Sequence, residues 1–342
     1  MIKVCVKRID MTDIAILTAA LDAILDPLGN GGLITSKRIS APRLSDGRVS
    51  MILDVTGLST AQREALDDRI NEVVKKVPGV TDVRIAMTSE KVGRRLVAIA
   101  SGKGGVGKST LSANLAVALA RMGAKVGLID ADIYGPSQPR LMDTETARPT
   151  AKEKQLEPVP TRFGVPMLSM GHLVKPGQAV AWRGPMAGNA LGQLIDADWG
   201  DCDLIIVDLP PGTGDVQLSM ISKHKPVGAI IVSTPQDLAL IDATRAIDLF
   251  TQSTVPIIGI VENMAGYQCP SCGDVSDPFG NGGAEHAARD MNYAFMGRIP
   301  LDIEIRKASD AGEPPAAGEG PAATSFRAIA QGLLTWLDSQ KV

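Results

Sequence analysis

Aromatic residues are scarce in this sequence, the formal charge is close to neutral, and no hydrophobic run is long. Phe, Trp and Tyr make up 3% of the 342 residues, which leaves few platforms on which single-stranded bases could stack. A net charge of −3 does not indicate the basic surface that nucleic-acid binding requires. No apolar run approaches the roughly 18–20 residues of a membrane span. We therefore expect neither nucleic acid nor membrane among the partners of this chain.

The N-terminus also lacks the features of a targeting segment. The stretch MIKVCVKRIDMTD has no apolar core of a signal peptide, and Asp10 and Asp13 argue against a transit peptide. The cysteines are too few and too unevenly placed for a disulfide framework. Two stand alone and two lie close together: Cys5, Cys202, Cys269 and Cys272. We expect a cytoplasmic protein in a reducing compartment.

One segment, Leu96 to Thr110, has the pattern of a phosphate-binding loop. It reads LVAIASGKGGVGKST: an apolar run typical of a buried strand, a glycine loop, and then the apolar periodicity of a helix. Glycines let backbone N–H groups converge on phosphate oxygens, and the helix N-terminus adds positive potential. Lys108 is predicted to bind the β- and γ-phosphates, and the Ser109 hydroxyl to ligate Mg²⁺. The residues predicted to surround the nucleotide are Gly102, Lys103, Gly104, Gly105, Val106, Gly107, Lys108, Ser109 and Thr110.

Acidic residues follow two further strands of the same part of the chain. From Leu96 onward strands alternate with helices, which predicts an α/β fold with a mostly parallel sheet covered by helices on both faces. The carboxyl ends of such strands face the ligand crevice, and Asp130 and Asp132 follow one of them. Asp208 ends a second apolar strand, as in a Walker B element, and is predicted to hold the hydration shell of Mg²⁺. The alternative for the first pair of acids is the capping of a helix or turn.

Cys269 and Cys272 have CxxC spacing in the loop GYQCPSCG. That spacing lets both sulfurs point at one metal, but it supplies two ligands where zinc and iron–sulfur clusters usually take four. A symmetric dimer could bring two pairs together around one [4Fe–4S] cluster or one zinc ion. A redox couple is the other possibility, although the CxxC of a thioredoxin opens a helix after the first strand, which this one does not.

Two domains are predicted. Residues 1–88 form a small α+β domain, residues 89–95 a polar linker, and residues 96–342 the P-loop domain that contains the CxxC loop. In the small domain the predicted order is helix, two strands, helix and strand, with the first two strands at Ile34–Ile39 and Val49–Val55.

Six strings, in one order along one chain, resemble the Mrp/ApbC family of P-loop ATPases in the MinD/ParA-like group. They are SGKGGVGKST, DADIYGPS, DLPPGTGD, TPQDLAL, VENM and CPSC. The resemblance implies a deviant Walker A loop in which Lys103 reaches the nucleotide of the partner subunit. Asp132 matches the residue that orients the attacking water, and Asn263 the residue that contacts the adenine edge. Residues 12–88 resemble the MIP18-like domain that precedes many such proteins, but lack the cysteine that often follows its second strand.

The resemblance implies a homodimeric, Mg²⁺-dependent ATPase, slow and switch-like, in which Lys103, Lys108, Asp132 and Asp208 act in catalysis. It would bind a [4Fe–4S] cluster between two subunits, at Cys269 and Cys272, and transfer it to apoproteins. Cluster assembly scaffold proteins are further expected partners. Two alternatives stay open. One is a partition- or positioning-type ATPase switch that binds DNA, membrane or protein, and the other is a zinc-bridged structural dimer.

Overall fold

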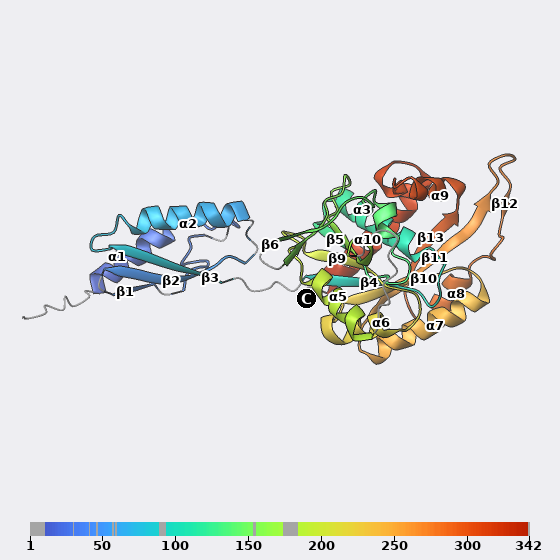
Figure 1. Cartoon of the computed structure of the whole chain (residues 1–342), viewed down its shortest axis with the longest axis horizontal. Coiled ribbons are helices and arrows are strands. Elements are labelled where there is room, and N and C mark those ends of the chain that lie inside the picture. Colours follow the sequence, from blue (N-terminus) through green and yellow to red (C-terminus); the bar gives the residue numbers. More distant parts are fainter. Residues whose placement is uncertain are drawn as a thin grey trace, which may run out of the picture. The chain divides into compact units, whose positions relative to one another are not determined.

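The computed structural model describes residues 11–29, 31–40, 42–45, 47–56, 58, 60–88, 94–152, 155–173 and 184–340. The chain divides into two compact units, Met1–Gly93 and Arg94–Val342 (Figure 1). Most of the expected linker, residues 89–93, and Cys5 lie outside the described residues. Among the described helices, none combines the length and the apolar character needed to cross a membrane.

The N-terminal unit is a small sheet with two helices. Its elements are α1 (Met11–Asp22), β1 (Arg43–Ser45), β2 (Arg48–Asp54), α2 (Thr60–Val74) and β3 (Asp82–Thr88). The sheet order is β1-β2-β3, with β2 antiparallel to β1 and parallel to β3. Alternate residues of β2 are buried, as the period of two in a strand requires, and they pack with residues of both helices. This unit is therefore α+β, as predicted.

The strand predicted at Ile34–Ile39 is wrong. This segment forms turns, and the first strand of the sheet is β1 instead. The cause is the carboxylate of Asp22, which accepts hydrogen bonds from the backbone N–H groups of Ile34 and Thr35 and from the Thr35 hydroxyl. Lys37 then takes a positive φ of 61°, which ends any extended run. Apolar periodicity alone does not reveal a side chain that accepts hydrogen bonds from backbone N–H groups twelve residues away.

The larger unit is built on an eight-stranded sheet. The order is β12-β11-β10-β4-β9-β5-β8, and β13 also pairs with β11. Every pairing is parallel except that of the short β12. The strands are β4 (Arg95–Ala100), β5 (Val126–Asp130), β8 (Met167–Ser169), β9 (Leu204–Asp208), β10 (Gly228–Ser233), β11 (Ile257–Gln268), β12 (Val275–Ser276) and β13 (Phe295–Leu301), with β6 (Thr150–Lys152) and β7 (Gln155–Glu157) as a separate hairpin.

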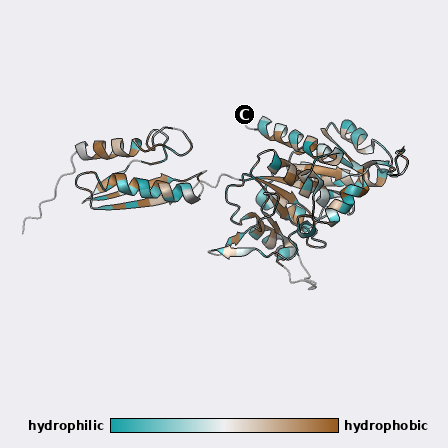
Figure 2. Ribbon diagram, turned by 90° about the horizontal axis from the view of Figure 1, so that it is seen from above, coloured by the Kyte–Doolittle hydropathy of each residue, from teal (hydrophilic) through white to brown (hydrophobic). Residues whose placement is uncertain are grey.

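Helices cover both faces of this sheet, and each face has its own hydrophobic core. α3, α9 and α10 pack on one face, and α5, α6, α7 and α8 on the other (Figure 1). Hydrophobic residues concentrate on the central strands, with hydrophilic residues on the outer surfaces (Figure 2). The helices are α3 (Lys108–Arg121), α4 (Gln138–Leu141), α5 (Gly184–Ile195), α6 (Asp215–Ser219), α7 (Asp237–Gln252), α8 (Gly283–Asp290), α9 (Ile303–Asp310) and α10 (Pro321–Ser339), with short non-α turns η1 (Met170–His172), η2 (Met220–His224) and η3 (Pro315–Ala317). The predicted fold class is confirmed.

Strand β11 is longer than a typical buried strand because its second half leaves the core. The first half is buried in the sheet, and the residues from Met264 onward are only half-buried or exposed. Met264 and Gly266 have positive φ angles of 60° and 72°, and the pairing of β11 with β13 changes register between Asn263 and Tyr267. The strand therefore bends out of the sheet and continues into a hairpin with β12 (Figure 1).

Candidate functional site

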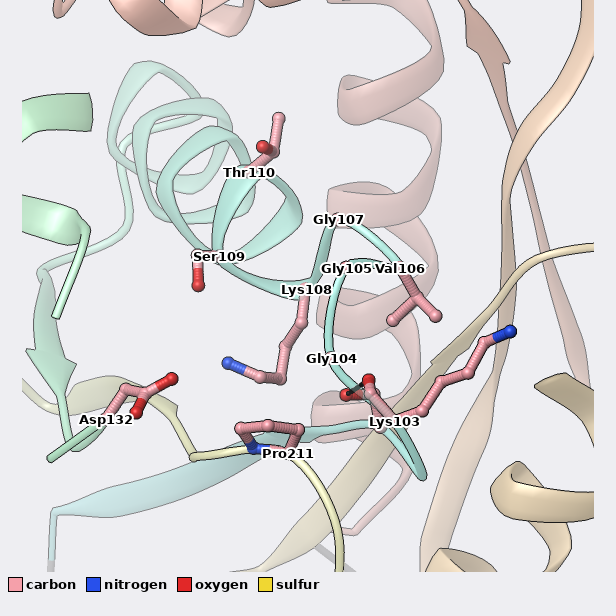
Figure 3. Close-up of a pocket in the computed structure, with 11 residues that line it drawn as sticks. Lys103, Gly104, Gly105, Val106, Gly107, Lys108, Ser109, Thr110, Asp132 and Pro211 are labelled. Atoms are coloured by element: carbon pink, nitrogen blue, oxygen red, sulfur yellow. Dashed lines mark hydrogen bonds between the residues drawn. The ribbon is translucent and has the colours of Figure 1, made fainter. Parts of the chain in front are cut away.

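The phosphate-binding loop joins β4 to α3 and lines a cavity of about 270 Å³. Figure 3 shows the loop curling around this cavity, with Asp132 and Pro211 on the opposite side. The lining residues are Ser101, Lys103, Gly104, Gly105, Val106, Gly107, Lys108, Ser109, Thr110, Asp132 and Pro211. Most residues predicted to surround the nucleotide are thus gathered at one cavity at the N-terminus of α3, where N–H groups and the helix dipole favour anions.

Two predicted residues of the loop have different surroundings. Gly102 packs against α7, and a Cβ atom there would come within 2.0 Å of the backbone of Asp242, so the position requires glycine. Lys103 lines the cavity, but its side chain points away from that of Lys108, on the other side of the loop (Figure 3). The two lysines of the motif therefore extend from the loop in different directions.

Lys108 and Asp208 form a buried ion pair beneath the loop. The Lys108 ammonium lies 2.6 Å from Oδ1 of Asp208, and the Asp208 side chain is fully buried. The Ser112 hydroxyl, one turn along α3, donates to the same oxygen at 3.0 Å. In this arrangement the lysine that is predicted to bind phosphates neutralises the carboxylate of β9 instead. A buried carboxylate needs such partners, because an uncompensated charge away from water is costly.

Gln138, the first residue of α4, completes the set of donors around Asp208. Its Nε2 atom donates to Oδ2 of Asp208 and to the carbonyl of Ser109, both at 2.9 Å. The side chain is wholly buried. Sequence reasoning missed this residue, because a single glutamine in the string GPSQPR carries no spacing rule that would mark it.

Asp130 holds both ends of the loop that carries Asp132. Its Oδ1 accepts from the backbone N–H of Asp132 at 3.1 Å, and its Oδ2 accepts from the backbone N–H of Gln138 at 3.1 Å and the Ser169 hydroxyl at 2.9 Å. Burial, and then the neighbouring carboxylate of Asp208, raise the pKa of Asp130 to about 7. Asp132 itself borders the cavity and accepts two backbone N–H bonds, from Tyr134 and Gly135.

Asn263, at the bend of β11, supports the phosphate-binding loop from behind. Its Nδ2 atom donates to the carbonyl of Val106 at 2.8 Å. A Cβ atom on Gly107, which has a φ of 84°, would meet the same nitrogen at 1.9 Å, so the contact requires glycine there. Asn263 is buried and does not line the cavity. The contact of Asn263 with adenine stays a prediction. The structure adds a second role, the hydrogen bond by which Asn263 supports the phosphate-binding loop.

The donor set beside the cavity fits magnesium. Ser109 and Asp132 line the cavity and supply a hydroxyl and a carboxylate, and Asp208, fully buried beneath the loop, supplies a second carboxylate; these are the hard oxygen ligands that Mg²⁺ prefers. Figure 3 shows the Ser109 hydroxyl and the Asp132 carboxylate on either side of the Lys108 ammonium.

The CxxC pair lies at the tip of the β11–β12 hairpin. Cys269 directly follows β11, and Cys272 lies in the turn, which is closed by the backbone bonds from Cys269 N–H to Asp274 and from Gly273 N–H to Cys269. Cys269 is half-buried and Cys272 is exposed. The backbone N–H groups of Cys272 and Ser271 lower the pKa of the Cys269 thiol, which favours the thiolate that binds metals.

No third ligand accompanies these thiols within the described part of the chain. In those residues no group of three or more His, Cys, Asp or Glu side chains could hold a metal ion. Cys202 is buried elsewhere, and burial raises the pKa of its thiol to about 11. Within the described residues, one chain thus offers two thiol ligands at the hairpin.

Comparison with known proteins identifies the family. A family model described as a NUBPL iron-transfer P-loop NTPase matches residues 93–334, and one described as an iron-sulfur cluster assembly protein matches residues 15–86. The chain belongs to the NUBPL iron-transfer P-loop NTPase family. A relative in Deinococcus radiodurans, named iron-sulfur cluster carrier protein, is 42% identical over 330 residues, 93% of each chain. The resemblance predicted from the six strings is confirmed.

Solved structures place this NUBPL-family chain among nucleotide-binding proteins. A nucleotide-binding protein from Archaeoglobus fulgidus, in complex with ADP, is 39% identical, with a TM-score of 0.60 over 68% of this chain and 91% of that chain. The cell division protein MinD of Aquifex aeolicus is 25% identical, with a TM-score of 0.53 over 70% of this chain and 97% of that one. The chain is a P-loop NTPase of the MinD/ParA fold.

Proposed function

We propose that this chain is an ATP-hydrolysing carrier that binds an iron–sulfur cluster and transfers it to apoproteins. The observation that carries the proposal is a pair of accessible thiols, Cys269 and Cys272, on a hairpin of a NUBPL-family P-loop NTPase. The strand that leads into this hairpin also contacts the phosphate-binding loop, through Asn263. The relative named iron-sulfur cluster carrier protein supports an iron–sulfur cluster as the cargo. Recipients would be apo iron–sulfur proteins, with cluster assembly scaffold proteins as donors.

The nucleotide cycle begins with an exchange of partners by Lys108. In the described structure its ammonium lies on Asp208; in the proposed cycle it moves to the β- and γ-phosphates of ATP, whose charge it neutralises. Asp132, fixed by the N–H groups of Tyr134 and Gly135, accepts the attacking water on the other side of the cavity. Mg²⁺, held by Ser109 with Asp208 on its hydration shell, would supply further neutralisation of the phosphate oxygens.

A second copy of the chain completes both sites in this proposal. Lys103 extends from the loop away from Lys108, a direction that suits contact with the nucleotide of a facing subunit (Figure 3). A homodimer also brings two CxxC pairs together, and four thiolates match the usual ligand set of one bridging [4Fe–4S] cluster. ATP-driven closure of the dimer would change the distance between the two hairpins, and with it the hold on the cluster.

The alternatives fit the described residues less well. A positioning-type ATPase that anchors by an amphipathic tail would need a free apolar helix face. The apolar face of α10 is instead buried in the core, with Phe326, Ile329, Leu333 and Leu337 all at most 2% exposed. A partition-type switch gives no role to the two accessible thiols. Free thiols in a carrier of labile clusters suit a reducing cytoplasm, which we propose as its location.

Anaerobic reconstitution with iron and sulfide tests the proposal. We expect about four irons per dimer with visible absorbance, lost in the Cys269→Ser/Cys272→Ser variant while ATP binding is kept. The matched control is Cys202→Ser, at the buried cysteine away from the hairpin, which keeps its cluster. Iron that persists in the double variant would place the cluster elsewhere. If zinc is the only metal bound by the wild-type protein, the carrier function is wrong and a zinc-bridged dimer is the better interpretation.

A further inference from the structure

The side chain of Gln138 is oriented by its two donor contacts. Nε2 lies between two acceptors, the Ser109 carbonyl and the Asp208 carboxylate. Rotating the amide by 180° would set its oxygen against both, so the assignment of donor and acceptor is unambiguous. The remaining atom, Oε1, is buried and has no hydrogen-bond partner among the described residues. The two bonds of Nε2 therefore fix the orientation of the side chain.

Gln138 also connects three elements that must act together. Its backbone N–H is bound by Asp130 at the end of β5, and its side chain contacts α3 at Ser109 and β9 at Asp208. The loop that carries Asp132 ends at Gln138, so the position of this loop is tied to Asp208. The link to the carboxylate depends on the side-chain amide, because Ala131, at the start of that loop, donates only to the backbone carbonyl of Asp208 in the described structure.

When Lys108 moves from Asp208 to the phosphates of ATP, the Asp208 carboxylate needs another hydrogen-bond donor. Lys108 and Ser112 share Oδ1 of Asp208, and Gln138 alone of the described side chains donates to Oδ2. When the lysine leaves for the phosphates, the fully buried carboxylate loses the ammonium, and the Mg²⁺ whose water ligands it would bind becomes its cationic partner. An ionised carboxylate in that position is stable only if its remaining lone pairs keep donors. Without the amide, Asp208 would hold Lys108 more tightly, and the phosphates would have to compete for it.

We propose that Gln138 is a positioning residue for nucleotide binding and hydrolysis, whose amide holds Asp208 in place while Lys108 exchanges that carboxylate for the phosphates of ATP. The inference rests on the proposed roles of Lys108 and Asp208. It assigns Gln138 no contact with the nucleotide and no proton transfer. Its effect is expected mainly on the affinity for ATP, with a smaller effect on the rate of the chemical step.

The test substitutes Gln138→Met, which keeps the length of the side chain and removes the donor. We expect the affinity for ATP with Mg²⁺, measured by titration calorimetry, to fall about tenfold, with KM rising by a similar factor and kcat changing less than threefold. Gln331→Met, at an exposed position of α10, is the matched control and keeps wild-type values. Thermal unfolding of each variant confirms that the P-loop unit is folded.

A double-mutant cycle separates positioning from a general structural role. In the Asp208→Asn background, Gln138→Met should change ATP affinity by less than twofold, since its partner is already altered. An equal fold-loss in both backgrounds, or wild-type affinity in the single Gln138→Met variant, overturns the inference. If Asp208→Asn and Lys108→Ala both bind and hydrolyse ATP like wild type, the proposed nucleotide mechanism fails as well, which distinguishes that failure from one confined to Gln138.

Discussion

The nucleotide site and the thiol pair are built in opposite ways. Around the phosphate-binding loop, the acidic groups Asp130 and Asp208 are fully buried, and each is hydrogen-bonded by residues from at least two elements. At the hairpin tip, Cys272 is exposed and Cys269 half-buried, and the turn is held by bonds between its own residues, two from backbone N–H groups and one from Nε2 of Gln268 to the Gly273 carbonyl. The first is formed by the core of the larger unit, and the second projects beyond it (Figure 1).

This difference corresponds to two kinds of task. Phosphate chemistry needs groups that are already oriented when the substrate arrives, because electrostatic stabilisation works best without reorganisation. A carrier must also release its cargo, and in the proposed dimer the two accessible thiols of each chain would give a hold that depends on a second chain. Asn263 connects the two regions, since it lies in β11 between the phosphate-binding loop and the hairpin.

The largest difference between the two regions is expected in the reactivity of their cysteine thiols. At pH 7.5 we expect iodoacetamide to modify the cysteines of the hairpin at least about a hundredfold faster than Cys202, because the pKa of Cys269 is lowered while burial raises that of Cys202 to about 11. Peptide mass spectrometry over time measures both rates. Comparable rates would mean that the core around Cys202 opens as readily as the hairpin, and that the two regions do not differ in accessibility.

A complementation experiment tests whether one chain is sufficient for ATP hydrolysis. If it is not, the nucleotide site depends on a second chain, as the proposed cluster site does. Lys103→Ala and Asp132→Ala should each reduce ATPase activity to about 1% of wild type or less. In a heterodimer of the two, purified through two different tags, one of the two sites combines an intact Asp132 with an intact Lys103 from the partner. We expect about half of the wild-type activity. An inactive heterodimer would show that Lys103 acts within its own subunit.

Asn263→Ala tests the connection between the two regions. It leaves the Val106 carbonyl without its side-chain donor, which should weaken ATP binding about tenfold, in line with about 1–3 kcal/mol for a buried group left unpaired. Asn281→Ala, at an exposed asparagine after the hairpin, serves as the control. Fluorescence titration with an ATP analogue measures both. If Asn263→Ala binds ATP like wild type, the loop is held without β11 and the two regions are independent.

The last prediction concerns the pH dependence of stability, which tests the buried carboxylates of the nucleotide site. Asp130 has a folded-state pKa of about 7 against an ordinary value of 3.8, so between these pH values the folded chain binds more protons than the unfolded one. Its contribution to stability is therefore lost as pH rises from about 4 to 7. Asp130→Asn should flatten the dependence of Tm on pH in this window, measured by calorimetry of the full chain. An unchanged slope would mean that Asp130 is already ionised at pH 4.

Much of the nucleotide site could be predicted because its residues are contiguous. The loop from Gly104 to Thr110 and the acid at the end of β9 follow rules of spacing and strand order that hold wherever a strand, a glycine loop and a helix occur in succession. The cysteine pair was equally visible from its spacing. The parallel sheet followed from the alternation of strands and helices, since helical crossovers leave few other arrangements.

The predictions that failed or were missing involve contacts between distant residues. The turn at Ile34 depends on a carboxylate in α1, and the length of β11 depends on pairing with β12 rather than on its own apolar run. Gln138 was missed because its partners lie 29 and 70 residues away. None of these contacts leaves a local pattern that periodicity or motif spacing could detect.

The sequence by itself therefore determined the family, the fold class and the chemical types of both sites, because these depend on residue identity and on spacing within single segments. The tertiary structure decided the partners: that Lys108 rests on Asp208, that Asn263 supports the loop instead of lining the cavity, and that the two thiols stand at the tip of a hairpin. The physical reason is that hydrogen bonds and burial act between groups close in space, and only the folded chain brings those groups together.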